Sequence, residues 1–250
     1  MGVMVKKNVL ILGSGPNVVE VHHHDLSVYD EIIAINNAWR VLETWTELIY
    51  PYDFPDDRKP VQISDQQKVV TETDFVDVQN QFGGFVYAGA TMAFTALYWA
   101  LGQHRPVKID VLGCDMVYDD TEKTHFYGKG TADPLRDDIT LRNLDAKSAR
   151  FFCIAMLNDC SVSNLSIAKS RLVFPRSYYV LNPLSPEVQE VHRKAHDILT
   201  IERTLGYFVE SGRYWESDMN FDTHQMDAID QRWLVCANDL LRLIETEQGV

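Results

Sequence analysis

The chain has 250 residues, of which 46% are hydrophobic and 24% charged, and its formal net charge is -13 at pH 7. This length suits one large domain, or one domain with an appended lid. The composition is that of a globular protein and suggests neither disorder nor a repeat architecture. The acidic balance argues against a nucleic-acid partner, because polyanions are bound by clusters of Lys and Arg.

The cysteines and the apolar runs bear on cellular location. The four cysteines lack the spacing of metal ligands and have apolar neighbours, so we expect reduced core thiols in a cytoplasmic protein. The short apolar run near the amino terminus shows no sign of a cleavable signal peptide. Residues 83–102 approach membrane-spanning length, but Thr91, Thr95 and Tyr98 favour a buried helix, so no transmembrane segment is predicted.

The first predicted strand covers residues 9–12 and runs directly into Gly13-Ser14-Gly15. Four apolar residues in succession are typical of a strand that is covered on both faces. The glycines permit close approach of the backbone to a phosphate, which favours a nucleotide or a nucleotide-linked sugar as ligand. An ordinary tight turn would show the same pattern. A helix around residues 18–24 and a strand over 31–37 would complete a β-α-β unit.

The middle of the chain is less regular. Residues 46–50 fit a third short strand, a proline-rich loop follows, and the polar segment 61–82 is expected to be a surface segment. The next helix runs to Leu101, with Gly102 as its carboxyl-terminal cap, and it is apolar nearly all round. We therefore expect this helix inside the fold.

A strand over residues 107–112 delivers Gly113-Cys114-Asp115 to its carboxyl end, where open α/β sheets bind ligands. The loop that follows, residues 116–138, has a length typical of functional or disordered loops. A helix over residues 144–158 and a short strand over 160–165 come next.

The last hundred residues change character. A helix over residues 184–208 begins behind Ser185-Pro186, and a second one over 223–247 has Thr223 as its expected cap. We predict an α/β Rossmann-type fold, with a mostly parallel sheet flanked by helices and a carboxyl-terminal helical extension. The predicted domains are 1–175, which binds the nucleotide, and 176–250, which packs on it or acts as a lid.

Several short motifs occur in a set order: Ile11-Leu12-Gly13-Ser14-Gly15-Pro16-Asn17, then Ala34-Ile35-Asn36-Asn37, then the Gly89-containing apolar helix, then Leu112-Gly113-Cys114-Asp115. In this order the chain resembles the bacterial sialyltransferases of glycosyltransferase family 42. It also resembles the wider group of related Rossmann-type proteins that includes 6-hydroxymethylpterin diphosphokinase-like proteins. The resemblance covers residues 8–165, with gaps in the middle.

The resemblance implies where a donor nucleotide would bind. It assigns the nucleotide to the first glycine loop, to the amide that closes the second strand and to the loop after the later strand, that is, to Gly13, Ser14, Gly15, Asn36, Gly113 and Asp115. These residue types suit the task, because backbone N–H groups at a helix start receive phosphate and a carboxylate accepts ribose hydroxyls.

The resemblance also implies catalytic roles. In the family, two tyrosines stabilise the departing phosphate and a histidine deprotonates the acceptor hydroxyl, and here Tyr118 and Tyr127 are the available tyrosines. The chain has Lys129 where the family places its base. We therefore assign the base to His125, whose ordinary pKa near ~6.5 suits proton transfer at neutral pH.

These assignments predict a transferase, of the sialyltransferase-like glycosyltransferase type. It would take a nucleotide-sugar such as a CMP-sugar as donor and a small molecule with a hydroxyl group as acceptor. The sequence leaves open whether the protein forms homo-oligomers. One alternative is a diphosphokinase that uses ATP with Mg²⁺ on Asp115, Asp119 or Asp120. Another is a catalytically silent nucleotide-binding or assembly protein. No other cofactor and no resident metal are predicted.

Overall fold

A computed structural model describes residues 7–118, 123–130 and 136–248 of the chain. The described residues form a six-stranded sheet with the strand order β4-β3-β2-β1-β5-β6, in which every neighbouring pair is parallel. In chain order the strands are β1 (Asn8–Leu12), β2 (Glu31–Ile35), β3 (Glu47–Ile49), β4 (Lys68–Val70), β5 (Lys108–Leu112) and β6 (Ser161–Asn164). The predicted α/β Rossmann-type arrangement is confirmed.

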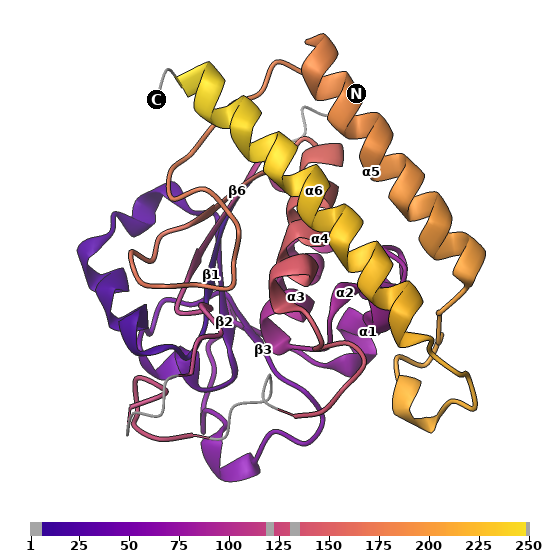
Figure 1. Ribbon diagram of the computed structural model, residues 1–250. Coiled ribbons are helices and arrows are strands. Elements are labelled where there is room, and N and C mark those ends of the chain that lie inside the picture. Colours follow the sequence, from indigo (N-terminus) through magenta and orange to yellow (C-terminus); the bar gives the residue numbers. More distant parts are fainter. Residues whose placement is uncertain (1–6, 119–122, 131–135, 249–250) are drawn as a thin grey trace, which may run out of the picture.

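The helices divide unequally between the two faces of the sheet (Figure 1). The α-helices are α1 (Glu72–Asn80), α2 (Phe85–Ala88), α3 (Met92–Trp99), α4 (Leu144–Leu157), α5 (Pro186–Leu205) and α6 (Thr223–Gln248). Short 3-10 helices are η1 (Pro16–His23), η2 (Leu26–Val28), η3 (Asn36–Arg40), η4 (Asp56–Arg58) and η7 (Tyr214–Glu216). A π-helical turn, η5 (Ala100–His104), extends α3.

Alternate residues of β1 face opposite layers of the core. Val9 and Ile11 join the larger core, which includes residues of α1, α3, α4, α5 and α6. Leu10 and Leu12 join the smaller core under η1 and η3. All four side chains are fully buried, as expected for a parallel strand that is covered on both faces.

The helical extension is tied to the rest of the fold through buried charges. The side chain of Arg150 on α4 donates to Glu202 on α5 with both N···O distances at 2.8 Å, and the indole of Trp233 on α6 donates to the same carboxylate at 2.8 Å. Lys147 on α4 pairs with Asp230 on α6 at 2.8 Å. These contacts support packing of the extension; the domain boundary at residue 175 stays a prediction.

The prediction for residues 61–82 is wrong, because this segment contains β4 and α1. Strand β4 lies at the sheet edge, and only Val70 in it is buried, so it lacks the apolar run of the central strands. Helix α1 begins with a capping box, in which Thr71 and Asp74 each bond the backbone of the other. That pattern is visible in the sequence and could have located the helix.

Three local predictions also need correction. The helix expected over residues 18–24 is the 3-10 helix η1, which begins earlier, at Pro16. Gly102 lies inside η5, where an added Cβ would come within 2.5 Å of a methyl group of Val78, and Arg105 with φ 48° ends the turn. The cap of α6 is Asp222, whose carboxylate accepts from the N–H groups of the first turn.

Within the described residues, no helix is both long and apolar enough to cross a membrane. The four cysteines are buried and free, as predicted.

Candidate functional site

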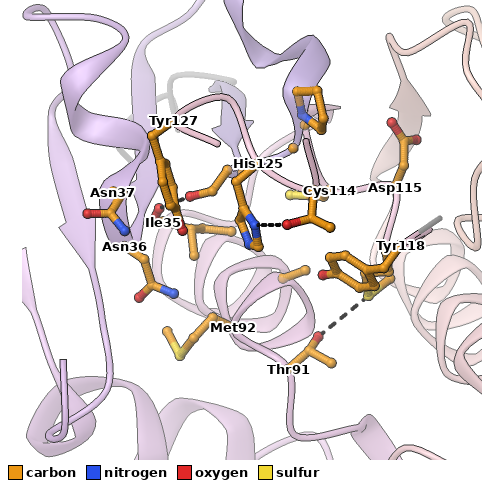
Figure 2. A pocket seen from close by; sticks show the side chains of 18 of the residues that line it. Ile35, Asn36, Asn37, Thr91, Met92, Cys114, Asp115, Tyr118, His125 and Tyr127 are labelled. Carbon is orange, nitrogen blue, oxygen red and sulfur yellow. Dashed lines mark hydrogen bonds between the residues drawn. The ribbon is translucent and has the colours of Figure 1, made fainter. Parts of the chain in front are cut away.

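A cleft of about 270 Å³ lies at the carboxyl edge of the sheet, where the strand order reverses between β1 and β5. This reversal is the usual place for ligands in open α/β folds. The cleft brings together all nine residues that the sequence analysis assigned to a site, namely Gly13, Ser14, Gly15, Asn36, Gly113, Asp115, Tyr118, His125 and Tyr127. Figure 2 labels five of the nine, namely Asn36, Asp115, Tyr118, His125 and Tyr127. Their roles there stay predictions.

The two glycine loops contact each other directly. The N–H of Gly13 donates to the carbonyl of Leu112, and the N–H of Gly15 donates to the carbonyl of Gly113, both at 2.8 Å. A Cβ on Gly13 would come within 2.3 Å of the Gly113 oxygen, and Gly113 itself has φ +76°. Glycine is therefore required at these positions, where two backbone segments meet. The N–H groups of Gly13 and Gly15 already donate hydrogen bonds within the protein, so they are not available to a ligand.

Other backbone groups are placed to receive an anion. Among the described residues, the N–H groups of Ser14 and Asn17 donate to no protein acceptor. Helix α3 begins at the same cleft, and its Met92 and Ala93 line it. Thr91 caps this helix by accepting from the N–H of Phe94 at 3.2 Å, which leaves the first two N–H groups of the helix for a ligand.

Two adjacent amides at the end of β2 carry unpaired oxygens. Asn36 has φ 52°, a left-handed conformation that Asn tolerates better than most residues. The Oδ1 atoms of Asn36 and Asn37 are both buried and have no hydrogen-bond partner among the described residues. Because unpaired buried oxygens are rare and costly, this pair indicates a place for a ligand that donates hydrogen bonds.

The Asp115 carboxylate is held by two amide side chains. Asn17 donates to one oxygen at 2.8 Å and Asn164 to the other at 3.0 Å. In the view of Figure 2, Asp115 lies on the opposite side of His125 from Asn36. Since each carboxylate oxygen accepts more than one hydrogen bond, Asp115 keeps capacity for ribose hydroxyls while its orientation is fixed.

The three predicted catalytic residues form an aromatic group on the rim. The ring of His125 stacks on Tyr127 with centroids 5.0 Å apart, and the Tyr118 ring lies 6.1 Å from His125. The segment is attached to the first glycine loop, because the N–H of Phe126 donates to the carbonyl of Ser14 at 3.1 Å. The segment that carries His125 and Tyr127 therefore adjoins the first glycine loop.

His125 is oriented and kept neutral by its surroundings. Its Nδ1 lies 2.9 Å from Oγ1 of Thr124, and that oxygen also accepts from the N–H of Gly130 at 3.0 Å. Burial lowers the pKa of His125 below its ordinary value of 6.5. A neutral imidazole near an open cleft has the protonation state that a general base needs.

Sequence reasoning missed several residues of this cleft. Asn37, Thr91 and Thr124 were not assigned to the site, because their importance depends on burial and on contacts with other segments. Arg58 also lines the cleft, and its guanidinium makes no ion pair with a described residue. It lies in the proline-rich loop, between Pro55 and Pro60, where no sequence pattern marked it as a site residue.

The alternative that uses a metal rests mainly on residues that the structure does not describe. Asp119 and Asp120 lie outside the described residues, as does the segment 131–135. Among the residues that are described, no three His, Cys, Asp or Glu side chains form a group that could hold a metal ion. Burial raises the pKa of the Cys114 thiol in the cleft, so this cysteine is a poor nucleophile.

Comparison with known proteins adds no family to this picture, since no family model, curated protein or solved structure matches the chain.

Proposed function

We propose that the protein is a transferase that uses a nucleotide-activated donor, of the sialyltransferase-like glycosyltransferase type. The observation that carries the proposal is the gathering of unpaired amide oxygens, free N–H groups and a histidine whose pKa is lowered by burial, all in one cleft at the strand-order reversal. Such a set offers acceptors for a nucleoside, donors for a phosphate and a base for an acceptor hydroxyl.

The donor would lie across the carboxyl ends of β1 and β2. The phosphate meets the N–H groups of Ser14 and Asn17 and the start of α3, with the Arg58 side chain at the rim. The nucleoside lies toward Asn36 and Asn37, whose unpaired oxygens accept from its amino or hydroxyl groups. In this architecture, phosphate groups commonly bind at the start of a helix, and polar side chains at the ends of strands commonly form hydrogen bonds with the nucleoside.

In the proposed reaction, the acceptor hydroxyl oxygen forms a bond to the anomeric carbon of the donor sugar. The bond from that carbon to the phosphate oxygen breaks, and the nucleotide leaves with the bonding electrons. Tyr118 and Tyr127 donate hydrogen bonds to the departing phosphate. The hydroxyl proton passes to Nε2 of His125, while Nδ1–H donates to Thr124, whose second lone pair already accepts from Gly130.

The test is calorimetry with CMP, UDP, GDP and ATP, each with and without Mg²⁺, followed by a transfer assay with the sugar conjugate of the nucleotide that binds. We expect His125→Ala to abolish transfer and to leave nucleotide affinity unchanged, because the ring acts on the acceptor. His23→Ala, at an exposed position outside the cleft, is the matched control. Unchanged turnover in His125→Ala would remove this residue from the mechanism.

The same titrations separate the alternatives. Binding of ATP that requires Mg²⁺ would favour a diphosphokinase. Binding of a nucleotide with no transfer to any acceptor would favour a catalytically silent binding protein. No binding of any nucleotide would contradict the proposal and leave an assembly role.

A further inference from the structure

A second and larger cavity, of about 670 Å³, adjoins the cleft. It is formed by residues 51–53, by α1, by the start of α3, by Arg136 and Asp138, and by residues 210–215 of the helical extension. Its volume falls within the usual range for small-molecule sites, roughly 300–1,000 Å³. Neither the nucleotide nor the residues assigned above require it.

The two cavities share part of their walls. Pro51, Asp53 and Met92 line both of them, so a molecule in the second cavity would lie next to one in the cleft. A transfer between two substrates requires this arrangement, because the reacting atoms must come within about 3–3.5 Å of each other. The position of the second cavity is therefore that of an acceptor site.

The charged groups of the cavity are mostly acidic. Its lining includes the carboxylates Asp53, Glu72, Asp77, Asp138 and Glu210, and only two arginines. Both arginines already have carboxylate partners: Arg136 bonds Asp138 at 3.2 Å, and Arg213 bonds Glu216 at 3.4 Å. This balance disfavours an anionic acceptor, since the remaining carboxylates would repel it.

The acidic groups are placed to accept hydrogen bonds. The Oε2 atom of Glu72 is buried and has no partner among the described residues. Asp138 stays ionised: burial opposes ionisation, but hydrogen bonds from Thr140 and Tyr214 lower the pKa of this carboxyl below its ordinary value. A ligand hydroxyl group would satisfy the Glu72 oxygen, whereas the Asp138 oxygens already accept from Thr140, Arg136 and Tyr214.

The rest of the lining is apolar and aromatic. Phe75, Val76 and Phe85 line the cavity, and Trp215 contributes a side chain that is 58% exposed. Tyr52, also in the lining, is 63% exposed. Exposed aromatic rings offer flat apolar surfaces beside the polar groups, which suits a molecule that has both an apolar face and hydroxyl groups.

We propose that this cavity binds the acceptor and that the acceptor is an uncharged saccharide, with its ring face against Trp215 and its hydroxyl groups on Glu72 and the neighbouring carboxylates. The inference rests on the proposed function for the reaction itself, but it makes its own claim about binding. A saccharide should bind in the absence of any donor.

The test is isothermal titration calorimetry of the full chain in the absence of nucleotide. The titrants are lactose and the methyl glycosides of galactose, glucose and N-acetylglucosamine. We expect Trp215→Ala and Glu72→Gln each to weaken saccharide binding by about tenfold or more, as loss of a central aromatic or polar contact does. Tyr178→Ala and Glu43→Gln remove an exposed aromatic and an exposed carboxylate that do not line the cavity. These controls should bind the saccharide as the unmodified chain does.

The outcome is separable from that of the proposed function, because the same variants are also titrated with the nucleotide. Trp215→Ala should keep nucleotide affinity, and Asn36→Ala should lose nucleotide affinity while keeping saccharide binding. Two results would overturn the inference: no saccharide binds although the nucleotide does, or glucuronic acid or glucosamine binds in preference to the uncharged sugars. Circular dichroism of each variant identifies any that fail to fold. If Trp215→Ala does not fold, saccharide binding by Glu72→Gln, which keeps the side-chain volume, tests the inference.

Discussion

The contact between the two glycine loops predicts a large effect from one methyl group. In Gly13→Ala, the new Cβ would lie 2.3 Å from the carbonyl oxygen of Gly113 and 2.5 Å from the Cys114 sulfur, so the loops must separate. Separation strains the two hydrogen bonds, each of 2.8 Å, that join the loops. Overpacking costs about 1–3 kcal/mol and each of the two hydrogen bonds contributes about 0.5–1.5 kcal/mol, which gives a loss of roughly 2–6 kcal/mol.

Urea unfolding followed by circular dichroism measures this loss. A destabilisation of about 3 kcal/mol would lower Tm by roughly 6–12 °C in a chain of this size. The matched control is Gly206→Ala, where an added Cβ meets nothing within 4 Å but φ is +68°. We expect this control to cost only about 1–2 kcal/mol, from the left-handed backbone alone.

Two outcomes would refute the reasoning. If Gly13→Ala costs no more than Gly206→Ala, the loops yield easily and their close approach does not explain the glycine. If Gly13→Ala loses nucleotide affinity without losing stability, the glycine serves access to the phosphate and not the contact between the loops.

Three further predictions follow from burial. Because burial lowers the pKa of His125, its base form is populated at neutral pH, and kcat/KM for transfer should fall only below pH 6.5. The free energy of unfolding should also decrease as the pH falls below 6.5, because the unfolded chain then binds the proton more readily than the folded one. A fall in kcat/KM centred above pH 7 would contradict this. Arg150→Met should cost about 3–5 kcal/mol in urea unfolding, because it leaves the Glu202 carboxylate buried without its ion pair, whereas Arg193→Met, at an exposed pair, should leave the midpoint unchanged; equal midpoints would show that water reaches the buried carboxylate. The four buried cysteines should resist a thiol reagent at pH 8 and react in guanidinium, so rapid labelling of the native chain would contradict their burial.

Sequence patterns predicted the central sheet well because its strands are short apolar runs. Strand β1 lies between β2 and β5 and is covered on both faces, so its sequence carries a strong and simple signal. Edge strand β4 has one buried residue out of three and was missed for that reason. The end of the helix was misplaced at Gly102, because the chain continues through this residue as the π-helical turn η5, which ends at Arg105.

The sequence predicted where the site lies in the fold better than it predicted the contacts that its side chains make. Parallel strands place the residues that follow them at one edge, so Gly13 and Asp115 were expected there, and the family resemblance added Asn36. The unpaired oxygen of Asn37 and the Thr124 contact of His125 depend on packing between distant segments. The second cavity was missed because its walls come from residues 51–53, α1 and residues 210–215.

The buried ion pairs of α4 have a consequence for how the chain is made. Arg150 and Lys147 find their carboxylates 52 and 83 residues later in the sequence. During synthesis the ribosome adds about 5–20 residues per second. For several seconds the nascent chain therefore carries two cationic side chains whose partner carboxylates have not yet been synthesised. The larger core can close only when α5 and α6 have emerged, and until then its apolar surface remains open to chaperones.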